Sequence, residues 1–260
     1  MRHPTALIHP DAKLADDVSV GAYSIIGAHV EIGAGSVVGP HVVIDGHTSI
    51  GKNNRFFQFS SIGEIPQDKK YQGEPTQLII GDNNTIRESC TLNLGTVQDG
   101  GITSIGSDNW IMAYVHVAHD CHIGDHNVIA NSVQFAGHVS VGNRTLIGGM
   151  TGIHQFVRIG DFAMVGFQTR LSQDLPPFVT AVGNPAEAKG PHQEGPRRAG
   201  YSAARVDMLK QIYRTLYRAG SSFETAKKEI AELRGQVAES DADIDNMLTF
   251  LNSASRGIVR

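Results

Sequence analysis

The sequence predicts a mainly β fold, in which a parallel β-helix of hexapeptide repeats over residues 1–182 is followed by a linker and a small α-helical domain over residues 183–260. Three observations support this prediction. Many of the 29 glycines follow a β-branched residue and are separated by multiples of six positions. An apolar residue returns every six positions through most of the chain. Beyond about residue 200 the apolar residues are three and four positions apart, which is typical of one face of a helix.

One position of the six-residue repeat is occupied by an apolar residue in every repeat, although apolar residues make up only 40% of the chain. Its members are Val20, Ile26, Ile32, Val38, Ile44, Ile50, Phe56, Ile62, Ile80, Ile86, Leu92, Ile105, Ile111, Val117, Ile123, Ile129, Phe135, Val141, Ile147, Ile153, Ile159, Val165 and Leu171. A short strand and a tight corner, repeated every six residues, return to the same face after three repeats, so the period predicts a triangular prism. Its coils stack about 4.8 Å apart and present flat sides. We therefore expect an active site on an outer face, in a loop or between subunits.

Small or β-branched side chains predominate two positions before each apolar member, and they are expected to point into the narrow prism. Cys90 and Cys121 occupy this inward slot. A chain with two isolated thiols is more simply reduced than bridged. We therefore interpret both cysteines as packing residues.

The repeat is interrupted twice, and we expect a loop at each interruption, over residues 63–77 and 95–102. The first is polar, contains prolines and spans three repeats, so it leaves the register unchanged. The second shifts the register by one residue. Loops on a rigid scaffold often carry function; neutral surface insertions are the alternative.

Composition excludes some classes of function. The net charge of −4 and the 18% charged fraction are not typical of a nucleic-acid-binding or disordered chain. The N-terminal residues lack the pattern of a signal peptide, and no uninterrupted apolar run is long enough to span a membrane. We expect a cytoplasmic protein without membrane insertion.

The C-terminal region predicts three helices that cover the open end of the prism. Ser202 is expected to cap the first, which ends near Gly220 and buries Val206, Leu209, Ile212, Tyr213 and Leu216. Ser221 and Glu224 are expected to form a capping box for the second, which buries Ala226, Ile230 and Leu233. The third is expected from Asp241 to Ser253, with Ile244, Met247, Leu248 and Leu251 inward.

A basic stripe lies on the first of these helices, where Lys210, Arg214 and Arg218 are four positions apart, with Arg197 and Arg198 nearby. This spacing places the three cations on one face. The stripe is either a solvated helix face or a docking site for an acidic partner.

A stretch of ionisable residues stands out within the small and apolar coils: His116, His119 and Asp120. Histidine is the usual general base near neutral pH. Taken alone, the stretch also fits metal ligation or hydrogen-bonded structural histidines.

Several motifs together resemble the UDP-N-acetylglucosamine O-acyltransferase family over the whole chain. They are the hexapeptide coils, the loop from Gln67 to Thr76, Ile86 to Ser89, His116 to Asp120, Ala136 to His138, Gly148 to Met150, His154 to Phe156, and Ser255 to Ile258. The resemblance implies a left-handed β-helix and a homotrimer with active sites between subunits. It implies transfer of an (R)-3-hydroxyacyl group from acyl carrier protein to the 3-hydroxyl of UDP-N-acetylglucosamine, the first step of lipid A biosynthesis. It implies no cofactor and no metal, because the thioester of acyl carrier protein is the activated co-substrate.

The family's functional positions carry over to residues of this chain. His119 matches the general base, Asp120 is expected to orient it, and the Gly137 backbone N–H is the implied oxyanion donor. Gly137 lies 18 residues after His119, so the repeat also places it on the same face one coil away. The implied substrate-binding residues are Gln67, Asp68, Lys70, Asn93, His116, Asn131, His138, His154, Gln155, Phe167, His192, Glu194 and Arg198. The residues expected to dock the carrier protein are Arg197, Lys210, Arg214 and Arg218.

Phe167 stands where the family determines acyl length and where a glycine leaves room for a long chain. It follows Gly149, Asn131 and Ala113 in steps of 18, so we expect these residues to stack in one column. A benzyl group there should shorten the groove, which predicts a hydroxyacyl chain below 14 carbons, roughly 10 to 12. Packing of the ring at the subunit interface is the alternative.

Three positions depart from the family pattern. Asn93 replaces a histidine, His192 replaces an asparagine, and Ala199 replaces the second arginine of a pair, which Arg197 could supply. Asparagine retains hydrogen bonding but cannot titrate. The sequence therefore leaves open whether the acceptor carries oxygen or nitrogen at position 3.

Other classes are weighed against this function. A hexapeptide-fold zinc enzyme of the carbonic anhydrase type would use His116, His119 and His138 as ligands, and a purely structural solenoid would have no turnover to lose. The related N-acyltransferase of the pathway normally carries an extra N-terminal domain, whereas the repeats here begin within the first 20 residues.

Overall fold

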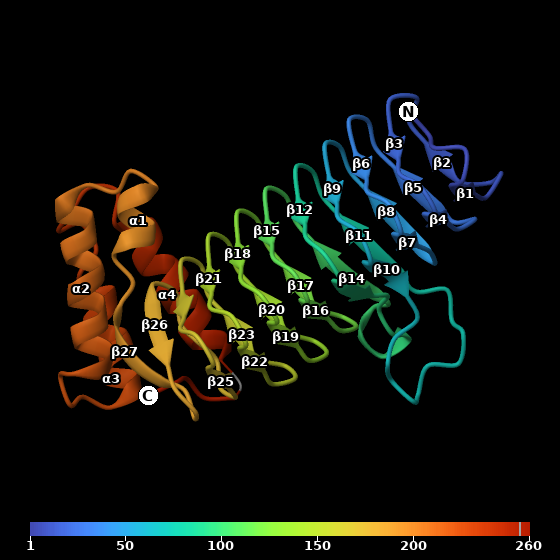
Figure 1. Cartoon of the computed structure of the whole chain (residues 1–260). Helices are drawn as coiled ribbons and strands as arrows, with labels where there is room; N and C mark the ends of the chain where they lie inside the picture. Colours follow the sequence, from blue (N-terminus) through green and yellow to red (C-terminus); the bar gives the residue numbers. More distant parts are fainter. Residues whose placement is uncertain (255) are drawn as a thin grey trace.

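The computed structural model describes residues 1–254 and 256–260 and shows a left-handed parallel β-helix with a helical cap at its C-terminal end (Figure 1). Ser255, part of one motif of the family resemblance, lies outside the described residues. The predicted fold class is confirmed.

Three sheets form the sides of the prism. The first contains β1 Leu7–Ile8, β4 Ile25–Ile26, β7 Val43–Ile44, β10 Ser61–Glu64, β13 Thr91–Asn93, β16 His116–Val117, β19 Gln134–Phe135, β22 Gly152–Ile153 and β25 Arg170–Leu171. The second contains β2 Lys13–Leu14, β5 Val30–Ile32, β8 His47–Ile50, β11 Gln77–Ile80, β14 Ile102–Ile105, β17 His122–Ile123, β20 Ser140–Val141 and β23 Arg158–Ile159. The third contains β3 Ser19–Val20, β6 Val37–Val38, β9 Arg55–Phe56, β12 Thr85–Ile86, β15 Trp110–Ile111, β18 Val128–Ile129, β21 Leu146–Ile147, β24 Met164–Val165, β26 Val179–Val182 and β27 Glu187–Pro191.

The interior of the prism follows the repeat. Every predicted apolar position from Val20 to Leu171 is at most 5% exposed. Cys90 and Cys121 are buried and unpaired with each other, and burial raises the pKa of these thiols to about 11 and about 12. Both therefore stay protonated at neutral pH, which fits the predicted packing role.

A ladder of asparagines also fills the inward slot, which the sequence analysis did not recognise. Asn54, Asn84, Asn109 and Asn127 are buried. Each of the first three accepts a hydrogen bond from the backbone N–H of the next, at 2.8–2.9 Å. The asparagine side chains thus bridge successive coils inside the prism and satisfy polar groups that burial would otherwise leave unpaired.

Glycine at the corners has a steric cause. A Cβ at Gly148 would lie 2.7 Å from the carbonyl carbon of Gly166 in the next coil. Only a residue without Cβ allows this approach of stacked backbones, which explains why glycine follows the strand so regularly.

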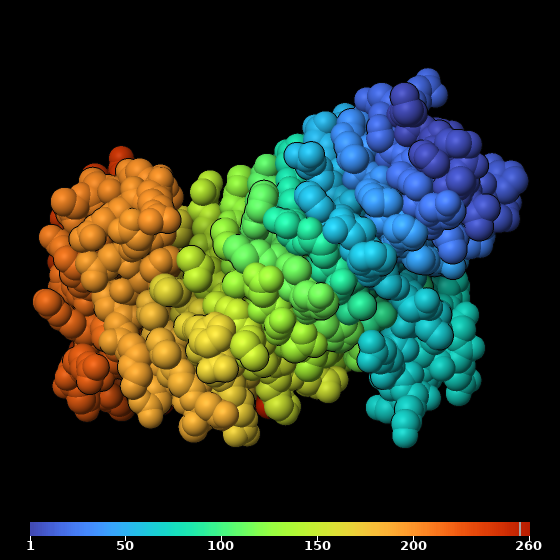
Figure 2. Space-filling view, viewed as in Figure 1, coloured from blue at the N-terminus to red at the C-terminus, as the bar shows by residue number. Residues whose placement is uncertain are grey.

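Two loops leave the coils close to the two interruptions of the repeat. Residues 65–76 connect β10 to β11 and project from the side of the prism, which Figure 2 shows as a protrusion beneath the N-terminal half. Residues 94–101 connect β13 to β14 and contain a short 3₁₀-helix, η1 Val97–Asp99. Both loops emerge between the first and second sheets, so they share one edge of the prism.

The helical cap consists of α1 Glu194–Arg198, α2 Ala203–Tyr217, α3 Phe223–Ala231 and α4 Asp241–Ser253. Ser202 caps α2 as predicted, by accepting a hydrogen bond from Arg205 N. The predicted Ser221 capping box is wrong: Ser222 caps α3 through Thr225 N, and Ser221 Oγ contacts Glu229 instead. Leu248, predicted inward, is only partly buried.

The region after the coils is more ordered than a linker. The strands β26 and β27 pair antiparallel, and the expected boundary at residues 182 and 183 falls at the turn between them. A helix, α1, occupies part of the remaining Gly/Pro-rich segment. Within the described residues, no helix combines the length and apolarity that crossing a bilayer requires.

Candidate active site

His119 and Asp120 form a buried pair at the edge where the first and second sheets meet, in the corner between β16 and β17. The Nδ1 atom of His119 lies 2.8 Å from Asp120 Oδ2. An ionised carboxylate only accepts hydrogen bonds, so Nδ1 carries the proton and Nε2 presents its lone pair. This is the arrangement of a general base with an orienting carboxylate.

The Asp120 carboxylate is held by the second loop. Thr96 donates to it twice, from its backbone N–H to Oδ1 at 2.7 Å and from its hydroxyl to Oδ2 at 2.6 Å. The backbone N–H of Asp120 donates to Thr103 Oγ1 at 2.8 Å. The carboxylate is completely buried. The two hydrogen bonds from Thr96 replace the water molecules that burial removes from it.

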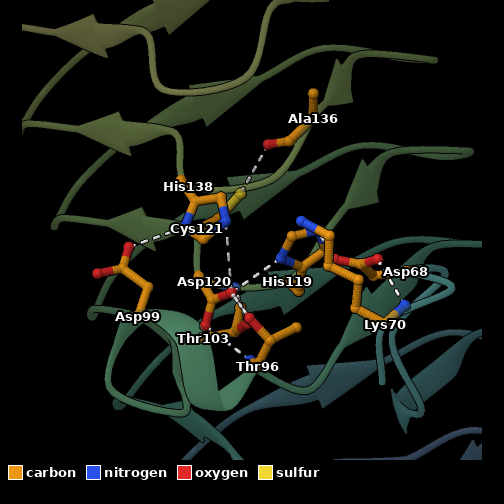
Figure 3. Close-up of polar contacts among 10 residues, drawn as sticks. All are labelled: Asp68, Lys70, Thr96, Asp99, Thr103, His119, Asp120, Cys121, Ala136 and His138. Atoms are coloured by element: carbon orange, nitrogen blue, oxygen red, sulfur yellow. Dashed lines mark hydrogen bonds and ion pairs between the residues drawn. The ribbon is translucent and has the colours of Figure 1, made fainter. Parts of the chain in front are cut away.

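His138 lies one coil beyond His119 and completes a cluster with this pair (Figure 3). Its Nδ1 is 2.7 Å from Asp99 Oδ2, and its Nε2 is 3.8 Å from Asp120 Oδ2. Its ring stacks on Phe156 at a centroid distance of 4.5 Å. The second loop therefore contacts both His138 and Asp120.

Gly137 lies directly beside the His119 ring. A Cβ at this position would be 2.5 Å from His119 Cε1, so the ring occupies space that any other residue would fill. Within the described part of the chain, the Gly137 N–H donates no hydrogen bond. It is therefore free to donate to a ligand held near His119.

The first loop brings Asp68 toward the same edge, with its Oδ2 at 3.9 Å from His119 Nε2. This distance is too long for a hydrogen bond. Asp68 also accepts from the backbone N–H of Lys70 at 2.9 Å, and Figure 3 shows both side chains on the His119 side of the loop. Gln67 belongs to the same turn and is exposed.

Asn93 anchors the base of the first loop. Its Nδ2 donates to the carbonyls of Glu64 and Ile65, at 3.3 and 3.0 Å. The residue is buried, and its Oδ1 has no partner within the described residues. This carbonyl oxygen is an unpaired acceptor at the predicted sugar-binding position.

A shallow groove crosses the outer face of the first sheet beside this cluster. His116, Gln134, His154 and Arg170 line it. His116 Nδ1 lies 2.7 Å from Thr91 Oγ1, and burial, followed by the nearby His119, keeps the pKa of His116 below its usual value. His116 therefore remains neutral at pH 7 and can serve as a hydrogen-bonding group.

His154 lines this groove, and Gln155 follows it in the corner after β22. His154 Nδ1 is 3.0 Å from the Gln155 carbonyl and 3.3 Å from an Arg256 guanidinium nitrogen. The C-terminal tail thus reaches the rim of the groove.

Asn131 and Phe167 lie at a different edge, where the third sheet meets the first. The predicted column exists, because a Cβ at Gly149 would lie 3.0 Å from the Asn131 carbonyl and 3.6 Å from the Phe167 ring. Phe167 is 61% exposed. The first sheet separates this column from His119, so one chain does not bring the two groups together.

His192 has a structural position, which argues against the predicted contact with substrate. The ring is buried, its Nδ1 lies 2.8 Å from the Phe162 carbonyl, and its Nε2 accepts from Gly195 N at 3.1 Å. Both nitrogens are therefore engaged at the start of α1. Glu194 and Arg198 pair with each other on the exposed side of α1, at 2.9 Å.

The basic stripe borders a second groove. Lys189, Lys210, Arg214 and Arg218 line it. Lys210 holds the pKa of Asp207 below its usual value, and Arg197 and Arg214 add to the effect. Four basic side chains therefore gather on this surface, as a docking site for an acidic partner requires.

Two residues of the cluster, Thr96 and Asp99, were not predicted. The one-residue shift of register pointed to their loop, but no periodicity within the loop indicated which side chains turn toward the coils. The described residues contain one group with the spacing of a metal site, His119, Asp120 and His138. His116, a ligand in the zinc alternative, is outside that group and contacts Thr91.

Known proteins of one family are similar to this chain over almost its full length. Residues 174–259 match the family model described as UDP N-acetylglucosamine O-acyltransferase, domain 2, and residues 102–137 match the bacterial transferase hexapeptide model. The acyl-[acyl-carrier-protein]–UDP-N-acetylglucosamine O-acyltransferases of Verminephrobacter eiseniae and Herminiimonas arsenicoxydans are 54% and 51% identical over 258 residues, covering 99% of this chain and 98% of theirs.

Solved structures show the same similarity. The UDP-N-acetylglucosamine O-acyltransferase of Moraxella catarrhalis has a TM-score of 0.95 at 46% identity, covering 100% of this chain and 99% of that one. The UDP-N-acetylglucosamine acyltransferase of Campylobacter jejuni has a TM-score of 0.93 at 38% identity, with both chains covered completely.

Proposed function

The chain belongs to the UDP-N-acetylglucosamine O-acyltransferase family of lipid A biosynthesis, and from this premise we propose how its residues carry out the reaction. It transfers an (R)-3-hydroxyacyl group from acyl carrier protein to the 3-hydroxyl of UDP-N-acetylglucosamine. The observation that supports this proposal most strongly is the buried His119–Asp120 pair beside the unbonded Gly137 amide.

His119 acts as the general base. Its Nε2 takes the proton of the sugar 3-hydroxyl as the oxygen attacks the thioester carbonyl, while Asp120 stabilises the imidazolium that forms. The Gly137 N–H donates to the oxyanion of the tetrahedral intermediate. The thiolate of the carrier then leaves and receives the proton from His119. Neither a cofactor nor a metal is required, because the thioester is already activated.

Residues around this pair bind the two substrates. Lys70, with Gln67 and Asp68 in the first loop, contacts the nucleotide sugar and the acyl donor, and the Asn93 carbonyl accepts from the sugar. His116 and His154 line the groove and bind substrate together with His138 and Gln155 beside it, and Glu194 and Arg198 lie near the uridine diphosphate. His192 acts indirectly, by fixing the start of α1 through its two hydrogen bonds.

The active site lies between the subunits of a homotrimer. The supporting observation is that His119 and the Asn131–Phe167 column occupy different edges of one prism. Only a neighbouring copy can bring the second edge of the prism next to the first. A measured mass of three chains in solution is expected, and a monomer would contradict this assembly.

Phe167 limits the acyl chain. A Cβ added at Gly149 would lie 3.6 Å from the Phe167 ring and 3.0 Å from the Asn131 carbonyl, so the ring stands at the end of the column that contains Asn131 and closes the predicted acyl groove there. Each methylene left unburied forfeits about 0.8 kcal/mol, which gives a preference below 14 carbons, roughly 10 to 12.

The test measures turnover with UDP-N-acetylglucosamine and a series of hydroxyacyl carrier proteins of increasing chain length. The natural enzyme should prefer the shorter donors, and Phe167→Gly should shift the preference to longer ones. Phe59→Gly, which removes a similarly exposed ring on the N-terminal coils, is the matched control. Absence of transfer with every donor would overturn the function, whereas an unchanged profile in Phe167→Gly would overturn only the role of Phe167.

A further inference from the structure

The second loop bonds to the active-site cluster at two points. Thr96 donates to Asp120, and Asp99 accepts from His138, whose ring belongs to the next coil. These contacts lie three residues apart, in and beside the single turn η1. The loop therefore adds side-chain hydrogen bonds between two successive coils of the candidate site, which the edge-on contact of the His119 and His138 rings also joins.

The His138 ring is constrained on three sides. Phe156 stacks on one face, the His119 ring meets it edge-on at 4.9 Å, and Asp99 accepts from Nδ1. The His138 ring could adopt two orientations that differ by a half-turn about the Cβ–Cγ bond, and stacking alone does not select between them. In the rotated ring, Cδ2 would face Asp99 and Cε1 would face Asp120. The hydrogen bond to Asp99 is the contact that selects between the two.

We propose that Asp99 is a positioning residue, which fixes the orientation and tautomer of His138 so that Nε2 faces the His119–Asp120 pair. With Nδ1–H donating to Asp99, Nε2 is the nitrogen available at the reaction centre, 3.8 Å from Asp120 Oδ2. The inference rests on the proposed acyl transfer, because it assigns the purpose of this arrangement to that reaction.

The burial of the two partners decides how much the contact contributes. The Asp99 side chain is 56% exposed, so water screens its charge, but the His138 side chain is only 10% exposed. Removal of the carboxylate therefore leaves a largely buried N–H without its partner. Because Asp99 lies in a surface loop, its replacement should not affect folding of the coils.

The experiment is a double-mutant cycle on Asp99 and His138 in the acyl transfer assay. Asp99→Ala should lower kcat/KM about tenfold, the scale of one charge-assisted hydrogen bond. Asp99→Asn should recover most of the rate, since its carbonyl oxygen still accepts from Nδ1–H. In a His138→Ala background, Asp99→Ala should have almost no further effect.

Asp108→Asn is the matched control, because Asp108 lies 3.9 Å from His126 at another corner and both are exposed. It should leave the rate unchanged. A full rate in Asp99→Ala, or an equal loss with and without His138, would overturn the proposal.

A second measurement does not depend on turnover. The ring ¹⁵N shifts of His138 should report a proton on Nδ1 in the natural protein and a mixture of tautomers in Asp99→Ala. Identical spectra in both proteins would refute the positioning role even if the acyl transfer were confirmed. A protein without acyl transfer but with the expected spectra would refute the function and retain the contact.

Discussion

The His119 ring depends on neighbours that the repeat places at fixed distances. Asp120 follows it in the chain, and Gly137 lies one coil further. The family resemblance assigned roles to these three residues, and the repeat predicted that His119 and Gly137 lie one coil apart on the same face, because position in the repeat determines position in space. It could not predict Thr96 or Asp99, because a loop without periodicity gives no direction to its side chains.

Replacement of His119 tests the assignment of the base. His119→Ala should lower turnover by about 10² to 10⁴, the usual contribution of general-base catalysis. The structure predicts no collapse of the coil, since the His119 backbone carbonyl still accepts from His138 N. Steady-state rates and the oligomeric mass would be measured together. A variant that keeps most of its rate would show that another group takes the proton.

At the scale of elements, strands were predicted more accurately than the segments that follow them. From β3 to β25, each coil strand contains a member of the repeat, because the period fixes which face of the strand is buried. The hairpin of β26 and β27 was missed, since pairing of two strands in opposite directions leaves no six-residue signal. The cap of α3 was placed one residue early because Ser221 and Ser222 are equivalent by composition, and only the backbone geometry selects Ser222.

Reversing the charge of the basic stripe on α2 tests the role of that stripe. Changing Lys210, Arg214 and Arg218 together to Glu should raise the apparent KM for acyl carrier protein and flatten its dependence on salt. Binding of the nucleotide sugar should change little, because the groove lies away from His119. The comparison is between initial rates at low and high ionic strength. An unaltered KM would mean that the stripe is only a solvated face.

At the scale of the whole molecule, the C-terminal tail fastens the helical cap to the last coil. Asp174 donates its backbone N–H to the Gly257 carbonyl and accepts from Val259 N. Its buried carboxyl accepts from Arg158 N at 2.9 Å. The sequence predicted that helices cover the open end, because an open end exposes unpaired strands. This attachment was beyond prediction, because it joins segments far apart in the chain without a repeat.

Burial raises the pKa of Asp174 above its ordinary value of 3.8. The folded protein therefore holds this proton more tightly than the unfolded chain, so this group's contribution to stability falls as pH rises from about 3.8 through the folded pKa. Asp174→Asn, which does not ionise, should become more stable relative to the natural protein over that interval. The difference between their thermal midpoints would be followed from pH 3 to pH 7. The opposite trend would exclude a raised pKa.

Under the proposed role of Phe167, the equal stacking of the coils would place possible blocking positions at regular steps along the acyl groove. Corner residues in one column recur at an inter-strand spacing of about 4.8 Å. A bulky side chain can therefore block the groove at one coil or at the next, for example at residue 167 or at residue 149. The length of acyl chain that fits would then change by several methylenes at a time. An enzyme of this proposed design would change its chain-length preference in discrete steps, while the structure of the coils stays the same.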